Sequence, residues 1–505
     1  MLRETQPQNF GWTFHRTMTS SNDFILTIDQ GTTSSRAILF DSCGTPVKTA
    51  QEEFTQIFPQ DGWVEHDANE IWETTKKVVD SVATDEVSCI GITNQRETTV
   101  VWDRSNGKPI YNAIVWQDRR TAPRCEQLTK DGKSTEIKKL TGLVTDAYFS
   151  ATKIEWILDN VDGARKRAEN GELAFGTIDS WLLWNLTKGK VHATDATNAS
   201  RTMLYDIREL KWSDYLLDLF NVPKSMLPDV HDNASDFGTT KLKGRNVPIT
   251  AMVGDQQSSS IGHRCFEKGM VKSTYGTGCF MLMNMGDEII QSDNLLTTIN
   301  YVVDGNPTYA LEGSIFIAGA VVQWLRDGLK IIEKASDTEE LAKKADPTQK
   351  VYFVPAFVGL GSPHWDPEAR GAIFGLTRNT TSAEICRAAL ESVCYQTKDL
   401  MDAMENDSGT RITQIRVDGG MTDNTLMVQF LCDLLGVSVS KPTLTETTAL
   451  GATYLAGMKH GIFGSLNEIA TYKSDERNHY PIKSRQFVEA KYADWCDAVS
   501  RTKTK

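Results

Sequence analysis

Two short turns rich in glycine and threonine constrain the fold most, because each follows an apolar run of β-forming residues and leads into another. The first turn, Gln30–Ser35, joins the runs Phe24–Asp29 and Arg36–Asp41. The second turn, Tyr275–Phe280, follows the run Met270–Thr274. Glycine and hydroxyl-bearing residues between two such runs predict a β-hairpin. The recurrence of this element predicts an approximate internal repeat, with one copy in each half of the chain.

Helix-like and strand-like segments alternate along the chain. Asp67 and Glu70 have the spacing of a helix N-cap and its third residue, and apolar residues follow at helical spacing as far as Val82. The next apolar run, Cys89–Thr93, is rich in β-forming residues, and Trp181–Leu186 is again typical of a helix. This alternation predicts an α/β fold.

The strand pattern begins again after residue 248, where an apolar run leads to Asp255, much as the first run ends at Asp29. We therefore expect two domains whose acid-bearing strand ends, one from each half of the chain, face each other across a gap. The expected division is 23–262 for the first domain, 263–505 for the second domain, and 1–22 for a flexible N-terminal extension.

Charge and composition exclude several classes of protein. The formal net charge is -12 over 505 residues, and an acidic chain repels nucleic acid and anionic membranes. No apolar run approaches the ~18 residues needed to cross a bilayer, so no membrane-spanning segment is expected. Nine cysteines without a Cys-x-x-Cys pair indicate reduced thiols and a cytoplasmic location. A presequence for an organelle within residues 1–22 is the less favoured alternative.

The first turn suits phosphate binding, although the chain has no Gly-x-x-x-x-Gly-Lys-Ser/Thr loop. Gly31 permits a tight turn whose backbone N–H groups point into one concavity. Thr32–Ser34 add hydroxyl groups and Arg36 adds a positive charge. Asp29, at the strand end, can hold Mg²⁺ directly or through water. Taken alone, this turn is explained equally well as an ordinary hairpin.

Asp255 and two further glycine-rich segments complete the candidate chemistry. Asp255 can accept a proton from an attacking hydroxyl, but an aspartate here is also a common helix N-cap. Gly276 and Gly278 allow close approach of a phosphate, or form a simple β-turn. The diglycine Gly419-Gly420 precedes the apolar run Leu426–Leu435. It predicts a helix start that exposes N–H groups to a ligand, with plain strand-to-helix connection as the alternative.

The order of these features resembles the actin–hexokinase–Hsp70 superfamily and, within it, the FGGY carbohydrate kinases. The FGGY resemblance is carried by Tyr148–Asn160, Gly359–Asp366 and Gly371–Arg378. Similarity to the family members that phosphorylate glycerol is carried by Asp29–Arg36, Gly62–His66, Gly91–Thr98, Asn112–Trp116 and Asn198–Met203. The resemblance as a whole runs from about residue 23 to beyond residue 460.

This resemblance implies an α/β fold of two ribonuclease-H-like (actin-like ATPase) domains flanking a catalytic cleft. It also implies Mg²⁺-dependent transfer of the γ-phosphate of ATP to glycerol, giving sn-glycerol 3-phosphate and ADP. The implied substrate-binding residues are Arg96, Glu97, Trp116, Tyr148, Asp255, Gln256 and Phe280, with Asp255 as the catalytic base. The implied nucleotide and phosphate residues are Thr32, Thr33, Ser34, Arg36, Thr277, Gly319, Gln323, Gly420 and Asn424. The implied metal-associated acids are Asp29 and Asp255.

Two alternatives remain open. An FGGY kinase for another polyol or for a ketose would share most of these residues. An actin-like or Hsp70-like nucleotide-driven binding protein would share the phosphate turns and the diglycine, but it would not require Arg96, Glu97 and Tyr148. We expect glycerol and ATP as the partners, no nucleic acid, and assembly into a homodimer or a homotetramer.

Overall fold

The computed structural model describes residues 23–366, 368–472 and 475–504. The predicted extension over residues 1–22 lies outside the described residues. Two mixed sheets organise the chain. In the first sheet, the strand order is β13-β14-β5-β1-β2-β3. Its strands are β1 Phe24–Gln30, β2 Ser34–Phe40, β3 Pro46–Glu53, β5 Val87–Asn94, β13 Thr239–Leu242 and β14 Arg245–Gly254.

The second sheet has the order β17-β18-β16-β15-β21-β22-β23. Its strands are β15 Val271–Tyr275, β16 Cys279–Gly286, β17 Leu296–Val303, β18 Asn306–Ile315, β21 Gln414–Asp418, β22 Ser438–Pro442 and β23 Glu476–His479. In each sheet an antiparallel hairpin, β1–β2 or β15–β16, is extended by a further antiparallel strand. Two parallel strands, β5 and β14 or β21 and β22, continue the sheet on the other side. This shared topology confirms the predicted pair of ribonuclease-H-like units.

The start of the second repeat differs from the prediction. The run before Asp255 is β14, which pairs in parallel with β5 and therefore belongs to the first sheet. The repeat starts instead at β15, the strand that enters the second glycine-threonine turn. The sequence pattern was misleading because every parallel strand of such a sheet is an apolar run that ends at the same polar edge.

Helices cover both sheets, and their ends follow local rules. The helix α1, Ala68–Val82, begins after Asp67, whose side chain accepts a hydrogen bond from the Asn69 N–H, as predicted for an N-cap. The remaining helices are α2 Ala122–Lys130, α3 Ser134–Thr141, α4 Ser150–Asn160, α5 Ala164–Glu169, α6 Ile178–Leu186, α7 Ala196–Ala199, α8 Asp214–Leu219, α9 Asp255–Gly262, α10 Gly319–Asp327, α11 Asp337–Ala342, α12 Ser382–Ser408, α13 Thr425–Leu435, α14 Thr447–His460, α15 Leu466–Ala470 and α16 Arg485–Thr502. The described residues also contain the 3₁₀ turns η1 Lys224–Met226 and η2 Gly420–Asp423.

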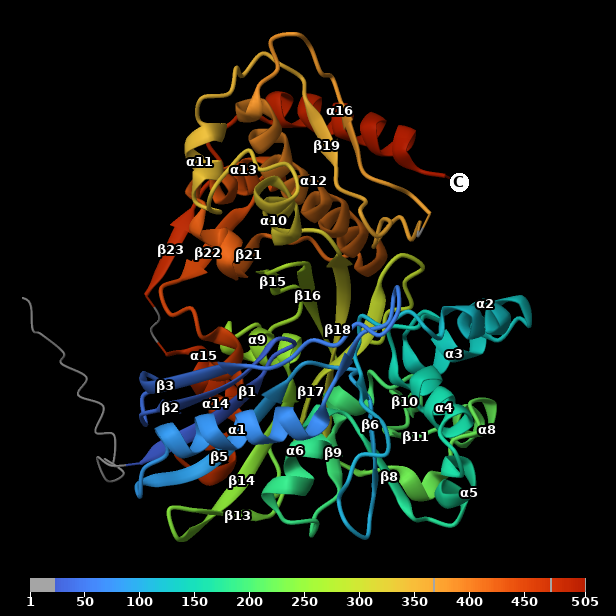
Figure 1. Cartoon of the computed structure of the whole chain (residues 1–505). Coiled ribbons are helices and arrows are strands. Elements are labelled where there is room, and N and C mark those ends of the chain that lie inside the picture. Colours follow the sequence, from blue (N-terminus) through green and yellow to red (C-terminus); the bar gives the residue numbers. More distant parts are fainter. Residues whose placement is uncertain (1–22, 367, 473–474, 505) are drawn as a thin grey trace, which may run out of the picture.

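Short strand pairs complete the fold. They are β4 Glu65–His66 with β7 Ala113–Ile114, β6 Val100–Asp103 with β8 Leu173–Gly176, β9 Ala193–Asp195 with β12 Asp229–His231, β10 Tyr205–Asp206 with β11 Lys211–Trp212, and β19 Tyr352–Val354 with β20 Ala372–Phe374. In Figure 1, α10–α13, α16 and β21–β23 form the upper part of the molecule, and the first sheet with α1 and α6 forms the lower part.

Two crossing helices join the halves of the chain. The helix α14, although late in the sequence, packs against β1, β5 and β14, and in Figure 1 it lies beside the blue strands of the first sheet. It crosses α9 at very close range, because a Cβ on Gly451 would lie 2.6 Å from the Ser258 carbonyl carbon. One apolar cluster accordingly contains both Ile25 of β1 and Leu455 of α14. The division into 23–262 and 263–505 stays a prediction, and the two halves share part of their core.

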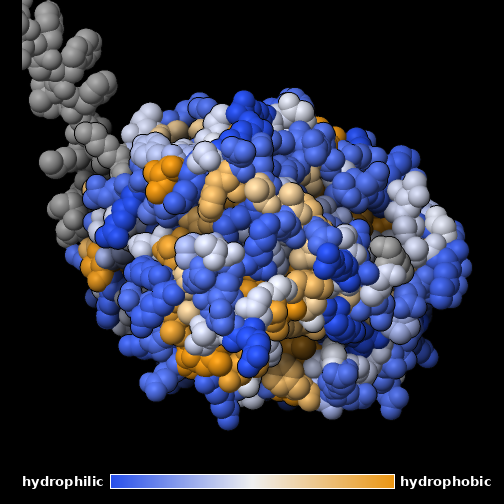
Figure 2. Space-filling view, turned by 90° about the horizontal axis from the view of Figure 1, so that it is seen from above, coloured by the Kyte–Doolittle hydropathy of each residue, from blue (hydrophilic) through white to orange (hydrophobic). Residues whose placement is uncertain are grey.

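The view from above shows a mostly hydrophilic surface in which orange residues are interspersed with blue ones (Figure 2). Among the residues that the structure describes, no helix combines the length and the apolar character that a bilayer crossing requires.

Candidate active site

The carboxyl edge of the first sheet carries both predicted acids. Gln30 of β1 and Gly254 of β14 are each in register with Asn94 of β5, which lies between them. Asp29 and Asp255, the chain neighbours of Gln30 and Gly254, therefore stand at the same edge of one sheet, two strands apart. The predicted arrangement, with acids from different halves facing each other across a gap, is wrong, because β14 belongs to the first sheet.

Arg96, just beyond β5, is the centre of the polar site and is only 3% exposed. Its Nε lies 3.3 Å from an Asp255 carboxylate oxygen and 3.9 Å from one of Glu97. Its Nη2 donates to the Tyr148 hydroxyl at 3.4 Å, and its Nη1 donates to Glu312 at 2.6 Å. The structure thus brings together four residues that the family resemblance assigns to one pocket, and adds a fifth, Glu312.

The backbone at Glu97 is strained, which is frequent at functional sites. Its φ of 61° lies in the left-handed region that favours glycine. Such strain costs about 1–3 kcal/mol and persists only when surrounding contacts hold it. Here the Ser150 hydroxyl donates to the Glu97 carbonyl oxygen at 2.9 Å, and the Arg201 guanidinium holds the Glu97 carboxylate at 2.6 Å. These contacts orient the Glu97 side chain.

Three aromatic rings form walls around this polar group. The Trp116 ring lies edge-on to Tyr148, with centroids 5.7 Å apart, and to Phe280, with centroids 6.1 Å apart. The Trp116 Nε1 donates to the Thr32 hydroxyl at 3.0 Å. Trp116 therefore connects the first glycine-threonine turn with Phe280, the last residue of the second turn.

Gln256 is oriented by a lysine on the second sheet. The Nζ of Lys272, in β15, donates to the Gln256 Oε1 at 2.5 Å and to the Thr274 hydroxyl at 3.1 Å. A lysine ammonium can only donate, so the amide oxygen of Gln256 must face Lys272 and its NH₂ group is left for other acceptors.

Burial and charge tune the titratable groups of the pocket. Burial raises the pKa of the Asp255 carboxyl to about 6, against the lowering effect of Arg96. Burial also raises the pKa of the Tyr148 hydroxyl and lowers the pKa of Lys272. Burial alone would raise the pKa of Glu312, but Arg201 and Arg96 outweigh it and hold that pKa at about 2. Asp255 is therefore a carboxylate at neutral pH with the basicity that suits proton transfer.

The first turn places its groups in different directions. The Arg36 guanidinium makes ion pairs with Asp29 at 2.5 Å and with Glu446 at 2.7 Å. The Ser34 hydroxyl accepts a hydrogen bond from Gln51 of β3 at 2.9 Å. The Thr33 carbonyl oxygen accepts from the Phe54 N–H at 3.3 Å. Among the hydrogen bonds of the described residues, the one from Trp116 to Thr32 is the only one that links this turn to the aromatic walls.

Two glycine-containing segments, the start of α10 and the diglycine, pack against the second turn. The Gly319 N–H at the start of α10 donates to the Gly276 carbonyl oxygen at 2.9 Å, and the N–H of Ala320 donates to the Thr277 carbonyl oxygen at 3.0 Å. A Cβ on Gly419 would lie 2.6 Å from the Tyr275 carbonyl carbon, so the diglycine also packs against this turn. The diglycine leads into η2 rather than directly into a helix, and α13 begins after Asn424, whose side chain accepts from the Met427 N–H at 3.0 Å.

These segments leave space for a nucleotide. A Cβ on Gly420 would meet nothing within 4 Å, and one on Gly276 would meet only a carbonyl of its own turn at 3.8 Å. Gln323, one turn into α10, is exposed. Open glycines with backbone N–H groups around them suit phosphate oxygens and a flat base. The residues present therefore fit an adenine nucleotide.

Mg²⁺ also fits the acids at the sheet edge. The described part of the chain contains no cluster of three or more His, Cys, Asp or Glu side chains arranged for a metal ion. Mg²⁺ in phosphoryl-transfer sites commonly uses one or two carboxylates together with water and substrate phosphates. Asp29 and Asp255 supply two such carboxylates.

Three residues of the site escaped the sequence analysis. Glu312, Arg201 and Lys272 are all buried, at 0% exposure. Arg201 lies in a stretch singled out for its similarity, but it received no role. Glu312 and Lys272 are single charges within otherwise uncharged strands, and a charge that is buried in such a strand needs a partner. That requirement is the signal that could have found them.

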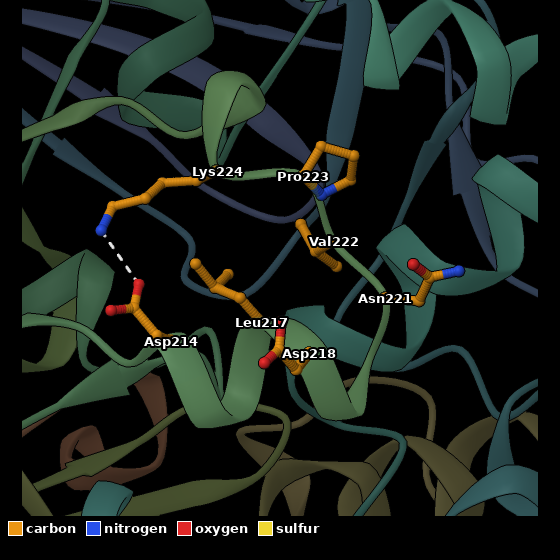
Figure 3. Close-up of a pocket in the computed structure, with 7 residues that line it drawn as sticks. All are labelled: Asp214, Leu217, Asp218, Asn221, Val222, Pro223 and Lys224. Atoms are coloured by element: carbon orange, nitrogen blue, oxygen red, sulfur yellow. Dashed lines mark hydrogen bonds and ion pairs between the residues drawn. The ribbon is translucent and has the colours of Figure 1, made fainter.

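A surface hollow of about 290 Å³ lies elsewhere, along α8 and the turn that follows it. Figure 3 shows Leu217 and Val222 pointing into it, and Lys224 reaching toward Asp214 at 2.9 Å. Its lining comes from residues 214–224 alone and includes none of the predicted site residues.

Several known proteins are similar to this chain over almost its whole length. Glycerol kinases of Alcanivorax borkumensis and Ectopseudomonas mendocina are 58% and 55% identical, and each alignment covers 95% of this chain and 98% or 99% of the relative. The crystal structure of Plasmodium falciparum glycerol kinase with ADP has a TM-score of 0.89 at 38% identity, covering 95% of this chain and 98% of that chain. A gluconate kinase of Lactobacillus acidophilus, 21% identical with a TM-score of 0.85, shares the fold.

Family profiles match almost the whole described chain. The N-terminal domain of the FGGY family of carbohydrate kinases matches residues 24–262, and its C-terminal domain matches residues 271–460. The chain belongs to the FGGY family of carbohydrate kinases.

Proposed function

We propose that this chain is a glycerol kinase, which transfers the γ-phosphate of ATP to glycerol and releases sn-glycerol 3-phosphate and ADP. The observation that carries the proposal is the cluster around Arg96, in which Glu97, Tyr148 and Asp255 meet between aromatic rings. The full-length similarity to glycerol kinases supports it.

The pocket matches the hydrogen-bonding needs of a small triol. Arg96 can only donate, the carboxylates of Glu97 and Asp255 can only accept, and Tyr148 can do both. Each glycerol hydroxyl both donates and accepts, so mixed partners satisfy all three. A substrate that lacks one hydroxyl leaves a buried polar group of the pocket unpaired, so the enzyme discriminates strongly against that substrate. The rings of Trp116 and Phe280 limit the length of the carbon chain.

Asp255 is the proposed catalytic base. Its carboxylate accepts the proton of the reacting hydroxyl while the glycerol oxygen forms a bond to the γ-phosphorus and the bond from that phosphorus to the β-phosphate bridging oxygen breaks. The electron pair of the broken bond leaves with ADP. In a loose transition state of this kind alignment and charge stabilisation contribute more than the base alone.

The remaining site residues are proposed to hold the nucleotide and its phosphates. Thr32, Thr33, Ser34 and Arg36 act from the first turn, and Thr277, Gly319, Gln323, Gly420 and Asn424 act from the second half. Asp29 and Asp255 would hold Mg²⁺, which when bound neutralises charge on the phosphate oxygens. The open space at Gly420 and Gly276 supports the nucleotide assignment.

A coupled assay for ADP tests the proposal. Purified protein with Mg²⁺ and ATP is given glycerol, 1,3-propanediol, xylulose or gluconate. We expect ADP release that depends on glycerol and is at least tenfold slower with the others. Faster turnover of a ketose would favour a sugar kinase of the same family. ATP turnover indifferent to every polyol would favour a nucleotide-driven binding protein.

We further propose that the protein assembles as a homodimer or a homotetramer and that its two domains divide between residues 262 and 263. We also propose a cytoplasmic location. The location is supported by nine cysteines that are all free, because reduced thiols are typical of that compartment. Light scattering on the purified protein measures the assembly.

A further inference from the structure

Glu312 lies on β18 of the second sheet, yet its side chain contacts the polar cluster around Arg96 at the edge of the first sheet. Its side chain is 0% exposed. One carboxylate oxygen lies 2.6 Å from Arg96 Nη1, and the other lies 2.8 Å from Arg201 Nη2. A single buried carboxylate thus bridges two buried arginines.

Arg201 closes the ring of charges. Its Nε lies 2.6 Å from the Glu97 carboxylate, and its guanidinium stacks over Tyr148 and Phe149 at 5.5 and 5.4 Å from the ring centroids. Glu97 in turn lies 3.9 Å from Arg96. Every charge in this ring has a partner, which is the condition under which buried charges are tolerated.

The ring fixes Arg96 at several points. Its Nη1 is held by Glu312 and by the Gln257 Oε1 at 3.2 Å, and its Nε faces Asp255 at 3.3 Å. A guanidinium is planar, so fixing two of its nitrogens fixes the direction of the remaining N–H groups. Without Glu312, the nearest carboxylates to Arg96 would be Asp255 and Glu97, the two groups that are proposed to accept from substrate.

Glu312 also shares a sheet face with an aromatic wall. Phe280 of β16 pairs with Ser314, and Ser314 lies two residues from Glu312 on β18. Side chains two residues apart in a strand point to the same face. The second sheet therefore presents both an apolar wall, Phe280, and the charge of Glu312 to the same pocket.

We infer that Glu312, assisted by Arg201, is a positioning residue that sets the direction of Arg96 and so the hydroxyl selectivity of the pocket. This inference rests on the proposed function. It assigns the hydroxyl-matching geometry to contacts between the two sheets rather than to the first sheet alone.

The test compares Glu312→Gln, Glu312→Asp and the control Glu384→Gln. Glu384 is also buried, at 3% exposure, but it belongs to the capping box of α12. For Glu312→Gln we expect the KM for glycerol to rise at least tenfold, with the KM for ATP within twofold of wild type. The preference for glycerol over 1,3-propanediol should shrink by a similar factor. Glu312→Asp, which keeps the charge, should recover part of both values.

The control Glu384→Gln should lose thermal stability without a change in the KM for glycerol or the KM for ATP. The inference is overturned if folded Glu312→Gln keeps the wild-type KM and selectivity, or if it raises both KM values equally. If Glu312→Gln does not fold, the variants Glu312→Asp and Arg201→Lys test the inference instead. The readouts are the same: the KM values for glycerol and ATP, and the preference for glycerol over 1,3-propanediol. Absence of glycerol-dependent ADP release in the wild-type protein would refute the proposed function itself, and is measured first.

Discussion

The crossing of α9 and α14 offers a test of how the two halves of the chain position the base. In Gly451→Ala, the new Cβ would lie 2.6 Å from the Ser258 carbonyl carbon and closer still to the Ser258 carbonyl oxygen, whereas ordinary contacts lie at 3.4–4 Å. The helices must therefore part by more than about 1 Å. Ser258 is in the first turn of α9, which begins with Asp255. Because a displacement of about 1 Å can already cost ~10²-fold in rate, we expect kcat for glycerol phosphorylation to fall by at least that order.

Stability should fall as well. Overpacking costs about 1–3 kcal/mol, and the better helix propensity of alanine returns up to about 1 kcal/mol. Circular dichroism during thermal unfolding measures this loss, and the coupled ADP assay measures kcat. A second change at the same crossing, Gly262→Ala, should add less to Gly451→Ala than it costs alone, since the helices have already moved apart. A Gly451→Ala protein with wild-type kcat and Tm would refute this account of the crossing.

Two further predictions concern the reaction itself. Burial raises the pKa of Asp255 to about 6, and the base must be unprotonated to accept a proton. We therefore expect kcat/KM for glycerol to be level above pH 7 and to fall about tenfold per pH unit below pH 6. A pH–rate profile without this decrease at low pH would contradict the assignment of Asp255 as the base. Gly420→Val should fill the open space beside the diglycine and raise the KM for ATP about tenfold, equivalent to ~1.4 kcal/mol, with the KM for glycerol unchanged. Equal effects on both KM values would place Gly420 outside the nucleotide site.

Local pattern was enough to predict the elements that carry the phosphate turns. The hairpins around Gly31 and around Gly276–Gly278 occur as β1–β2 and β15–β16, and the N-cap at Asp67 starts α1. These features depend on a few neighbouring residues, namely a glycine that allows the turn and a side chain that satisfies free backbone N–H groups. Such information is contained in a short stretch of sequence.

Long-range pairing could not be predicted in the same way. The placement of β14 in the first sheet and of α14 against β1 depends on contacts between segments about 160 residues apart or more. Glu312 was missed for the same reason, because its partners Arg96 and Arg201 precede it by 216 and 111 residues. Its isolated charge signalled that a partner was needed, but not which one.

The assignment of Asp255 as the base that serves a glycerol pocket is tested most directly by the turnover of Asp255→Asn. This variant keeps the shape of the side chain and removes its basicity. With Mg²⁺ and saturating ATP and glycerol, we expect kcat to fall at least ~10²-fold while glycerol still binds, as measured by calorimetry. The control Asp433→Asn changes an aspartate on α13 that is also buried, at 4% exposure, and should leave kcat unchanged. A folded Asp255→Asn protein that phosphorylates glycerol at close to the wild-type rate would contradict the account.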